Sequence, residues 1–419
     1  MSEQNIPLKV STISLATVVS VATFCALYAM SQFLRNSVAV IAPDLVRDIH
    51  LTAAELGLLS SAYFLMFGIA QIPLGIALDR FGPKPCLLAS ASIAVLGCAI
   101  FALAQSPDGL VLGRLLMGLG TASFLMAPLA IYARWFAPAQ FSTMTGIQTG
   151  IGTLGALLAT APLAFAAGAF GWRATFLGIG ALTFAIIVLV WGIVREHPTA
   201  RPGTLHQESW REAIGGVWRV MQAPGIGRLF LLQMTGYPTY LLVVGLWGGP
   251  YLAHVYGLDL QQRGEILFVP ALAQVIGSVF WGAMDRVFGR YKPPVLLAAA
   301  GTFLSLVLLA GIGSPPLPLL IIVLAVLGFA TGFVPLILGQ AKAQLPPRLL
   351  GRALTLLNIG AMGGGFLVQY LSGELIGRFQ AADGGYPLVA YQLVFGLQAA
   401  LLLGASMIYI GARDARHGS

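Results

Sequence analysis

Charged residues are scarce in this sequence. Only 9% of its 419 residues are Asp, Glu, Lys or Arg, whereas ordinary soluble domains carry about 25%. Apolar residues make up 58% of the chain, which is more apolar surface than a water-soluble fold can bury. The composition therefore excludes most soluble classes and indicates an integral membrane protein.

Cysteine and histidine, which often build catalytic or metal sites, are also rare. The three cysteines, Cys25, Cys86 and Cys98, fall in apolar stretches without paired or metal-ligand spacing. The five histidines are scattered, and the sequence has no phosphate-binding loop and no nucleophile–base pattern. We therefore expect no enzyme activity, no metal and no cofactor.

Long apolar runs dominate what is present. At about 20 residues per crossing, they predict an all-α membrane protein with 12 transmembrane helices in two pseudo-symmetric six-helix bundles. The first run, about 14–41, is too long for a cleaved signal peptide, so we expect it to remain as a helix. The predicted spans lie near 14–41, 54–77, 86–104, 108–133, 143–168, 174–194, 226–252, 264–284, 293–313, 316–341, 352–378 and 387–411.

The basic residues indicate how the chain sits in the membrane. The net charge is +8, yet most of the 23 Lys and Arg residues recur in short loops on one side of the predicted spans. That pattern indicates membrane orientation and not nucleic-acid binding. It predicts an integral protein of the cytoplasmic (inner) membrane with both termini in the cytoplasm.

The two halves of the sequence repeat. "GIALDRFGPK" (75–84) follows the second span and "GAMDRVFGRYK" (282–292) follows the eighth. We therefore predict an N-terminal bundle at 1–194, a cytoplasmic linker at 195–224 and a C-terminal bundle at 225–419. Internal repeats of this kind build transporter folds, with the substrate site between the repeats.

Two local patterns refine this division. Within the linker, Trp210, Ile214, Val217, Trp218 and Met221 recur at helical spacing, which is typical of a helix on the membrane interface. In the fifth and eleventh spans, the glycine pairs at 146 and 150 and at 360 and 364 predict close approach of helix backbones.

The motif at 75–84, G-x-x-x-D-R-x-G-x-K, strongly resembles the signature of the major facilitator superfamily. Arg114 with Gly118 in the fourth span is similar to a second motif of that superfamily. The resemblance implies the major facilitator fold and transport by alternating access. It also implies a cytoplasmic gate, made of Asp79, Arg80 and Lys84 with Asp285 and Arg286 as a looser counterpart. A simple topology anchor of positive charge remains the alternative.

Residues 28–43, "YAMSQFLRNSVAVIAP", resemble the anion:cation symporter branch, which takes up sugar acids and other organic anions. The resemblance implies that Arg35 holds the carboxylate of the substrate. A planar guanidinium matches a carboxylate in two parallel hydrogen bonds. Tyr28 and Gln32 share the face of Arg35 at helical spacing, so we expect them at the same site. Alternatively, Arg35 reaches the membrane surface or pairs with Asp44.

Polar groups from other spans complete the predicted substrate site. Tyr237 and Tyr240 lie on one face of the seventh span, and Gln148 and Asn358 occupy matching places in the fifth and eleventh. Each of them could instead hydrogen-bond between helices.

Proton symport, which the resemblance implies, is less well supported. Leu34 and Thr121 stand where that branch carries its usual carboxylates. Glu374 is the carboxylate well inside a predicted span, so it is a candidate for proton coupling, or it pairs with Arg378 at i+4.

Together these features predict a secondary active transporter that takes up a small organic anion, a carboxylate, by alternating access. Efflux of amphipathic or drug-like compounds, uptake of amino acids or peptides, and a sensor that keeps the transporter fold are the alternatives. We expect the chain to act as a monomer whose partners are membrane lipids and its small-molecule substrate, and not nucleic acid.

Overall fold

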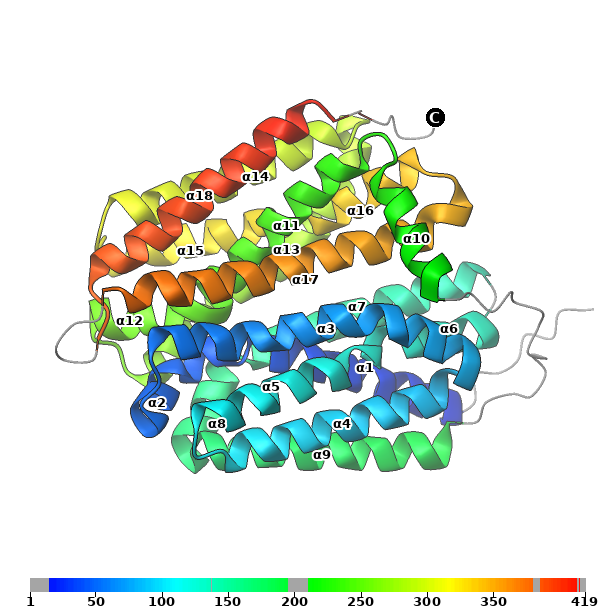
Figure 1. Ribbon diagram of the computed structural model, residues 1–419, viewed down its shortest axis with the longest axis horizontal. Helices are drawn as coiled ribbons and strands as arrows, with labels where there is room; N and C mark the ends of the chain where they lie inside the picture. Colours follow the sequence, from blue (N-terminus) through cyan, green and yellow to red (C-terminus); the bar gives the residue numbers. More distant parts are fainter. Residues whose placement is uncertain (1–14, 137, 195–209, 380–384, 413, 415–419) are drawn as a thin grey trace, which may run out of the picture.

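The computed structural model describes residues 15–136, 138–194, 210–379, 385–412 and 414, and these residues are almost entirely helical (Figure 1). The helices of the first half are α1 (Leu15–Asn36), α2 (Val38–Ile49), α3 (Ala53–Phe81), α4 (Pro83–Leu103), α5 (Pro107–Thr121), α6 (Ser123–Trp135), α7 (Pro138–Leu158), α8 (Ala161–Phe170) and α9 (Trp172–Ile193). Those that follow are α10 (Trp210–Met221), α11 (Ile226–Leu242), the π-helix η1 (Val243–Trp247), α12 (Gly248–Tyr256), α13 (Leu260–Phe288), α14 (Lys292–Gly311), α15 (Leu317–Thr331), α16 (Val334–Gln344), α17 (Pro347–Gly377) and α18 (Leu388–Ile410).

The number of membrane spans agrees with the sequence. In the described ranges, eleven helices are long and apolar enough to cross a bilayer, and α7 with α8 gives a twelfth. The helices lie along one direction in two groups, α1–α9 and α11–α18 (Figure 1). The predicted all-α fold of 12 spans is confirmed.

Several spans that the sequence predicts as continuous helices are broken. Between α7 and α8 the helix axis turns by 47°, because Pro162 cannot donate the hydrogen bond that would continue the helix. Pro335 opens α16 in the same way. In the first span the break falls at Ser37, whose hydroxyl donates to the Leu34 carbonyl at 3.1 Å.

The predicted glycine contacts are half right. A Cβ at Gly364 would lie 2.0 Å from the Met234 carbonyl oxygen, so α17 does pack closely on α11. Gly146 and Gly150 have nothing within 4 Å of a built Cβ. In α7 the close contact comes about one turn later, because a different face of α7 meets α1. A Cβ built on Gly155 would lie 1.9 Å from the Ala29 carbonyl oxygen.

The linker contains the helix that the sequence predicts, α10. Its Gly216 lies against the Arg352 side chain of α17, and its Trp218 is exposed. Residues 195–209 of the predicted linker, and both chain ends, lie outside the described residues.

The two groups of helices meet closely at the end of the molecule where α2 and α12 lie, which we call the α2 end (Figure 1). Gly249 of α12 would place a Cβ 1.7 Å from the Ala39 carbonyl oxygen of α2. Gly57 of α3 and Gly373 of α17 similarly face each other: a Cβ built on either one would lie 2.8 Å from the Cα of the other. At such distances only glycine fits, so backbone contacts close this end.

Candidate functional site

Arg35 lies near the end of α1, buried between the two groups of helices. Its side chain is 7% exposed. Its Nη1 donates to the hydroxyl of Tyr237 on α11 at 3.4 Å, and its guanidinium lies 4.7 Å from the centre of the Phe67 ring on α3. Its Nε has no hydrogen-bond partner among the described residues. The positive charge of Arg35 therefore lies between α3 of the first half and α11 of the second, and its contacts with both are weak.

Neither alternative that the sequence left for Arg35 occurs. Burial keeps the guanidinium from the surface. The carboxylate of Asp44 accepts instead from Arg47 at 3.1 Å and from Arg263 at 3.0 Å. In the part of the chain that the structure describes, Arg35 has no ion pair. Its charge is thus available to a ligand.

Most of the predicted site residues of α1 and α11 gather around Arg35. The hydroxyls of Tyr28 and Tyr237 are close enough to interact with its charge, as is that of Tyr63 on α3. Gln32 is 9% exposed. Three polar atoms of α1 and α11 are buried without a partner in the described residues: Gln32 Oε1, Gln233 Oε1 and the Tyr240 hydroxyl. Such atoms are costly unless something binds them.

Gln148 and Asn358 do not join this cluster. The Gln148 amide donates to the Phe24 carbonyl at 2.9 Å and accepts from the Tyr132 hydroxyl at 2.8 Å, so it connects helices within the first half. Asn358 is half-buried on α17 and makes no hydrogen bond to a described residue.

Sequence reasoning missed two buried amides, one from each half, that both lie beside Gly245 of η1. Asn36 follows Arg35 directly, and Gln369 lies on α17 in the run "FLVQYL". In the part of the chain that the structure describes, the amide oxygen of each has no donor. The sequence did contain a signal for both residues, because each is a polar residue inside an apolar span. Such residues are costly in a membrane and are therefore candidates for a function.

The described contacts of Lys84 and Lys292, in the two repeated loops, lie within their own halves. Lys84 Nζ donates to the carbonyls of Trp191 and Val194 at 2.9 and 2.6 Å, at the end of α9. In the second half, Lys292 repeats this with the Ala412 carbonyl at 3.5 Å, at the end of α18. A cation at a helix C-terminus is a favourable arrangement, so both lysines fasten the last helix of their half.

The charged residues of the repeated segments 75–84 and 282–292 differ in burial. Asp79, Arg80 and Arg286 are exposed, whereas Asp285 is 9% exposed. Burial, together with the charge and hydrogen bond of Asp285, raises the pKa of the nearby Tyr291 hydroxyl. Neither loop reaches across to the other half in the described contacts.

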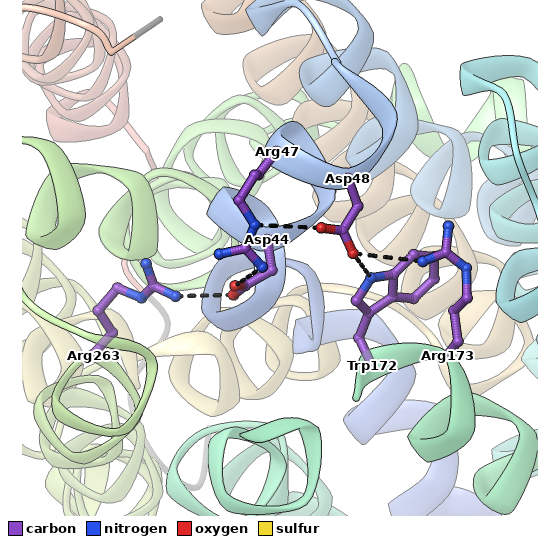
Figure 2. A network of polar contacts seen from close by, with 6 residues as sticks. All are labelled: Asp44, Arg47, Asp48, Trp172, Arg173 and Arg263. Atoms are coloured by element: carbon purple, nitrogen blue, oxygen red, sulfur yellow. Dashed lines mark hydrogen bonds and ion pairs between the residues drawn. The ribbon is translucent and has the colours of Figure 1, made fainter. Parts of the chain in front are cut away.

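A chain of ion pairs occupies the α2 end (Figure 2). Arg47 bridges Asp44 and Asp48 of α2, and Asp48 also accepts from Trp172 Nε1 at 2.9 Å and Arg173 Nη1 at 3.5 Å. Asp44 then pairs with Arg263 of α13. Among the described residues, this is the ion pair that joins the two halves.

Glu374 lacks the burial on which a coupling role would depend. It is exposed near the end of α17, as is Arg378, and the two form no ion pair. The described residues also contain no group of His, Cys, Asp and Glu that could hold a metal ion.

The family model described as Major Facilitator Superfamily matches this sequence over residues 24–261 and 229–418, which together span nearly the whole chain. The chain belongs to the major facilitator superfamily. It is therefore a membrane-spanning transporter and not an enzyme, and the resemblance read from its motifs is confirmed.

Individual members of the superfamily are similar along most of the chain. The hexuronate transporter of Escherichia coli K12 is 25% identical over 391 residues, which cover 88% of this chain and 89% of that protein. The probable sulfoacetate transporter of Cupriavidus necator is 26% identical, over 64% of each chain. A bacterial homologue of the lysosomal transporter Spinster, solved in an inward-facing and unoccupied conformation, superposes with a TM-score of 0.78 at 17% identity, covering 94% of this chain and 96% of that one. The last likeness concerns the fold.

Proposed function

We propose that this superfamily member takes up a small organic anion, a carboxylate, across the cytoplasmic membrane by alternating access. The single observation that carries the proposal is Arg35: a buried guanidinium between the halves, with no acid paired to it among the described residues. The relatives named for hexuronate and sulfoacetate, both organic anions, support the same class of substrate.

The energetics favour an anion over a neutral solute. A buried charge without a partner costs several kcal/mol, even after relaxation. A carboxylate on Arg35 neutralises that charge and forms charge-assisted hydrogen bonds, which are about twice as strong as neutral ones. Tyr28, Gln32, Tyr237 and Tyr240 then surround the bound anion with hydroxyl and amide groups.

We further propose the orientation and organisation that the sequence predicts. Both termini lie in the cytoplasm, the bundles are 1–194 and 225–419, and one chain suffices for transport. The basic loops support this orientation through the positive-inside rule. The α2 end is then the outer end, and its contacts close the pathway to the outside.

Gating follows from that orientation. We propose the Asp44–Arg263 ion pair as the outer gate, which breaks when the halves rock open to the outside. At the cytoplasmic end, Asp79 and Arg80 are exposed, so they remain candidates for cross-contacts in the opposite state. Lys84, Asp285 and Arg286 support those loops from within their halves.

The test is transport by purified protein in proteoliposomes. Radiolabelled galacturonate and gluconate serve as probes, with and without an imposed pH gradient. We expect saturable uptake by the wild type and its loss in Arg35→Gln. Arg219→Gln is the matched control, because Arg219 is exposed on α10 and, among the described residues, donates to the Gly215 carbonyl of its own helix. Uptake that is unaffected by Arg35→Gln would contradict the proposal.

A further inference from the structure

Helix α3 presents two aromatic rings to two buried arginines. The Arg35 guanidinium lies over the Phe67 ring, 4.7 Å from the ring centre. The Arg114 guanidinium of α5 lies over the Tyr63 ring, also at 4.7 Å. Tyr63 and Phe67 are about one helical turn apart on the same face of α3, and their rings are nearly parallel, at 18°, with centres 6.0 Å apart. The two rings thus form one aromatic surface that carries both guanidinium groups.

This aromatic surface is fixed in place. Both rings are buried, that of Tyr63 completely and that of Phe67 almost so. The Tyr63 hydroxyl donates to the Ser31 carbonyl at 3.1 Å and lies 2.6 Å from the Thr121 hydroxyl, so α1 and α5 both hold it. Phe67 packs against the Tyr63 ring, and its side chain has no polar atom. A guanidinium above Phe67 therefore meets a ring whose position is set by its neighbours.

The two contacts of Arg35 are weak beside an ion pair, but they act differently. The bond from Nη1 to the Tyr237 hydroxyl is 3.4 Å long, beyond the usual limit of about 3.2 Å for N–H···O bonds. The Phe67 ring attracts the cation through its electron-rich face, and that attraction increases where water is excluded. Because Arg35 and Phe67 are both buried, the ring contact is made in such a place.

A ring also suits an anion site better than an acid would. A carboxylate beside Arg35 would bond to its N–H groups and cancel its charge, in direct competition with a bound anion. The ring has no net charge and requires no hydrogen bond from the guanidinium. Among the described residues, Nε of Arg35 has no partner. The side chain is thus held while its donors stay available.

We propose that Phe67 is a positioning residue for anion binding, whose ring holds the Arg35 guanidinium in place without occupying its N–H groups. This rests on the proposed function, in which Arg35 holds the carboxylate. Without the ring, the long bond to Tyr237 is the described hydrogen bond that remains on the guanidinium. A long, flexible side chain must then be ordered each time an anion binds, and that ordering reduces the affinity.

The test changes the electrons of the ring and not its shape. Phe67 is replaced, by nonsense suppression in the full-length protein, with phenylalanines that carry one, two or three fluorine atoms on the ring. Fluorine withdraws electron density from the ring face, so the attraction for a cation weakens at each step. Galacturonate and gluconate are the probes, and their affinities are measured by isothermal titration in lipid nanodiscs. We expect the dissociation constant to rise at each step, by about tenfold in all.

Phe176 of α9 provides the matched control. It is fully buried, and its ring packs on the Phe101 ring of α4 with centres 4.6 Å apart. The same fluorinated series at Phe176 should leave the affinity unchanged.

Two further measurements separate positioning from packing. Phe67→Leu keeps an apolar side chain without a ring and should bind as weakly as the most fluorinated protein, whereas Phe67→Tyr keeps the ring and should retain the affinity. In proteoliposomes, the KM for galacturonate should rise along the fluorinated series while the maximal rate changes little, because the ring acts on binding.

The outcomes distinguish this inference from the proposed function. If binding depends on Arg35 but the affinity is constant along the Phe67 series, or increases with fluorination, the positioning role is wrong and the anion proposal stands. A series at Phe176 that weakens binding equally also overturns the positioning role. If neither galacturonate nor gluconate binds in an Arg35-dependent way, both proposals fail.

Discussion

At the scale of single residues, the structure separates two buried arginines that the sequence treats alike. Arg114 on α5 is fully buried; its Nη1 donates to the Leu34 carbonyl and its guanidinium lies 4.7 Å from the centre of the Tyr63 ring. It therefore supports the backbone at the break between α1 and α2. Within the described residues, Arg35 has a single long hydrogen bond, from Nη1 to the Tyr237 hydroxyl at 3.4 Å. Arg114 therefore positions α1, the helix that carries Arg35.

These roles predict opposite effects of substitution. Arg35→Gln should weaken carboxylate binding at least about thirtyfold, because losing one partner of a buried charge pair costs about 2 kcal/mol or more. The thermal stability of the ligand-free protein should stay the same or rise, since an unpaired buried charge is removed. Titration calorimetry and thermal unfolding in detergent check the two parts.

For Arg114→Gln we predict the reverse, a loss of stability in the ligand-free protein. The substitution removes a charged donor from the Leu34 carbonyl, which keeps the Ser37 hydroxyl as a donor. A hydrogen bond to a charged group contributes about 1.5–3 kcal/mol. Thermal unfolding measures the change. A variant that unfolds like wild type would show that Arg114 does not support the break in the first span.

At the scale of helices, each half contains a close glycine contact between two of its helices, and the two contacts match each other. A Cβ at Gly118 of α5 would lie 2.2 Å from the Tyr63 carbonyl oxygen of α3, and one at Gly328 of α15 would lie 2.1 Å from the Pro270 carbonyl oxygen of α13. Backbone atoms form both obstacles, so a side chain cannot be accommodated by a rotamer change. The internal repeat of the sequence is thus also a repeat of helix packing.

Gly118→Ala and Gly328→Ala should therefore each destabilise the protein by about 1–3 kcal/mol, the usual cost of overpacking. Gly146→Ala is the matched control, because nothing lies within 4 Å of a Cβ there, and it should be neutral or slightly stabilising. Thermal unfolding of the three variants in the same lipid mixture gives the comparison. Equal melting temperatures for Gly118→Ala and Gly146→Ala would contradict the packing interpretation.

At the scale of the whole molecule, the α2 end is held by two kinds of contact. Glycine backbone contacts, such as Gly249 with Ala39, bring the halves together, and the Asp44–Arg263 ion pair connects them. The pair continues into the network of Asp48, Trp172 and Arg173, which anchors α2 to the first half (Figure 2). Movement of α13 relative to α2 must break the pair.

Breaking this pair should favour opening at the α2 end. We predict that Asp44→Asn and Arg263→Gln each increase maleimide labelling of a cysteine at Ala53, which is 2% exposed beside Gly377. The rate should rise a few-fold, since a partly exposed ion pair contributes about 1 kcal/mol. Labelling is followed in nanodiscs, in a background where the three buried native cysteines are replaced by alanine.

Glu265→Gln provides the control for that experiment. Glu265 lies on the same helix as Arg263 but is exposed and bonds to Gln261 of its own helix. Its labelling rate should equal that of the unsubstituted background. If Asp44→Asn and Arg263→Gln also label at that rate, the ion pair does not act as a gate.

The sequence by itself determined the class, the number of spans and the superfamily of this protein. Hydrophobic runs must become helices in lipid, because every backbone polar group has to be satisfied within its own segment. The motif at 75–84 and the arginine in the first span could be recognised for the same reason: charge in an apolar run is costly, so its presence is informative.

Only the tertiary structure decided which polar residues act together. The sequence predicts both Gln148 and Arg35 at the substrate site, yet Gln148 has its hydrogen bonds within one half. Asn36 and Gln369, which are not predicted from the sequence, have amide oxygens with no partner among the described residues. Whether a buried polar group is satisfied depends on partners elsewhere in the chain, such as Phe24 for Gln148 and Leu241 for Gln369. No local pattern encodes that pairing, because it is set by how the helices pack.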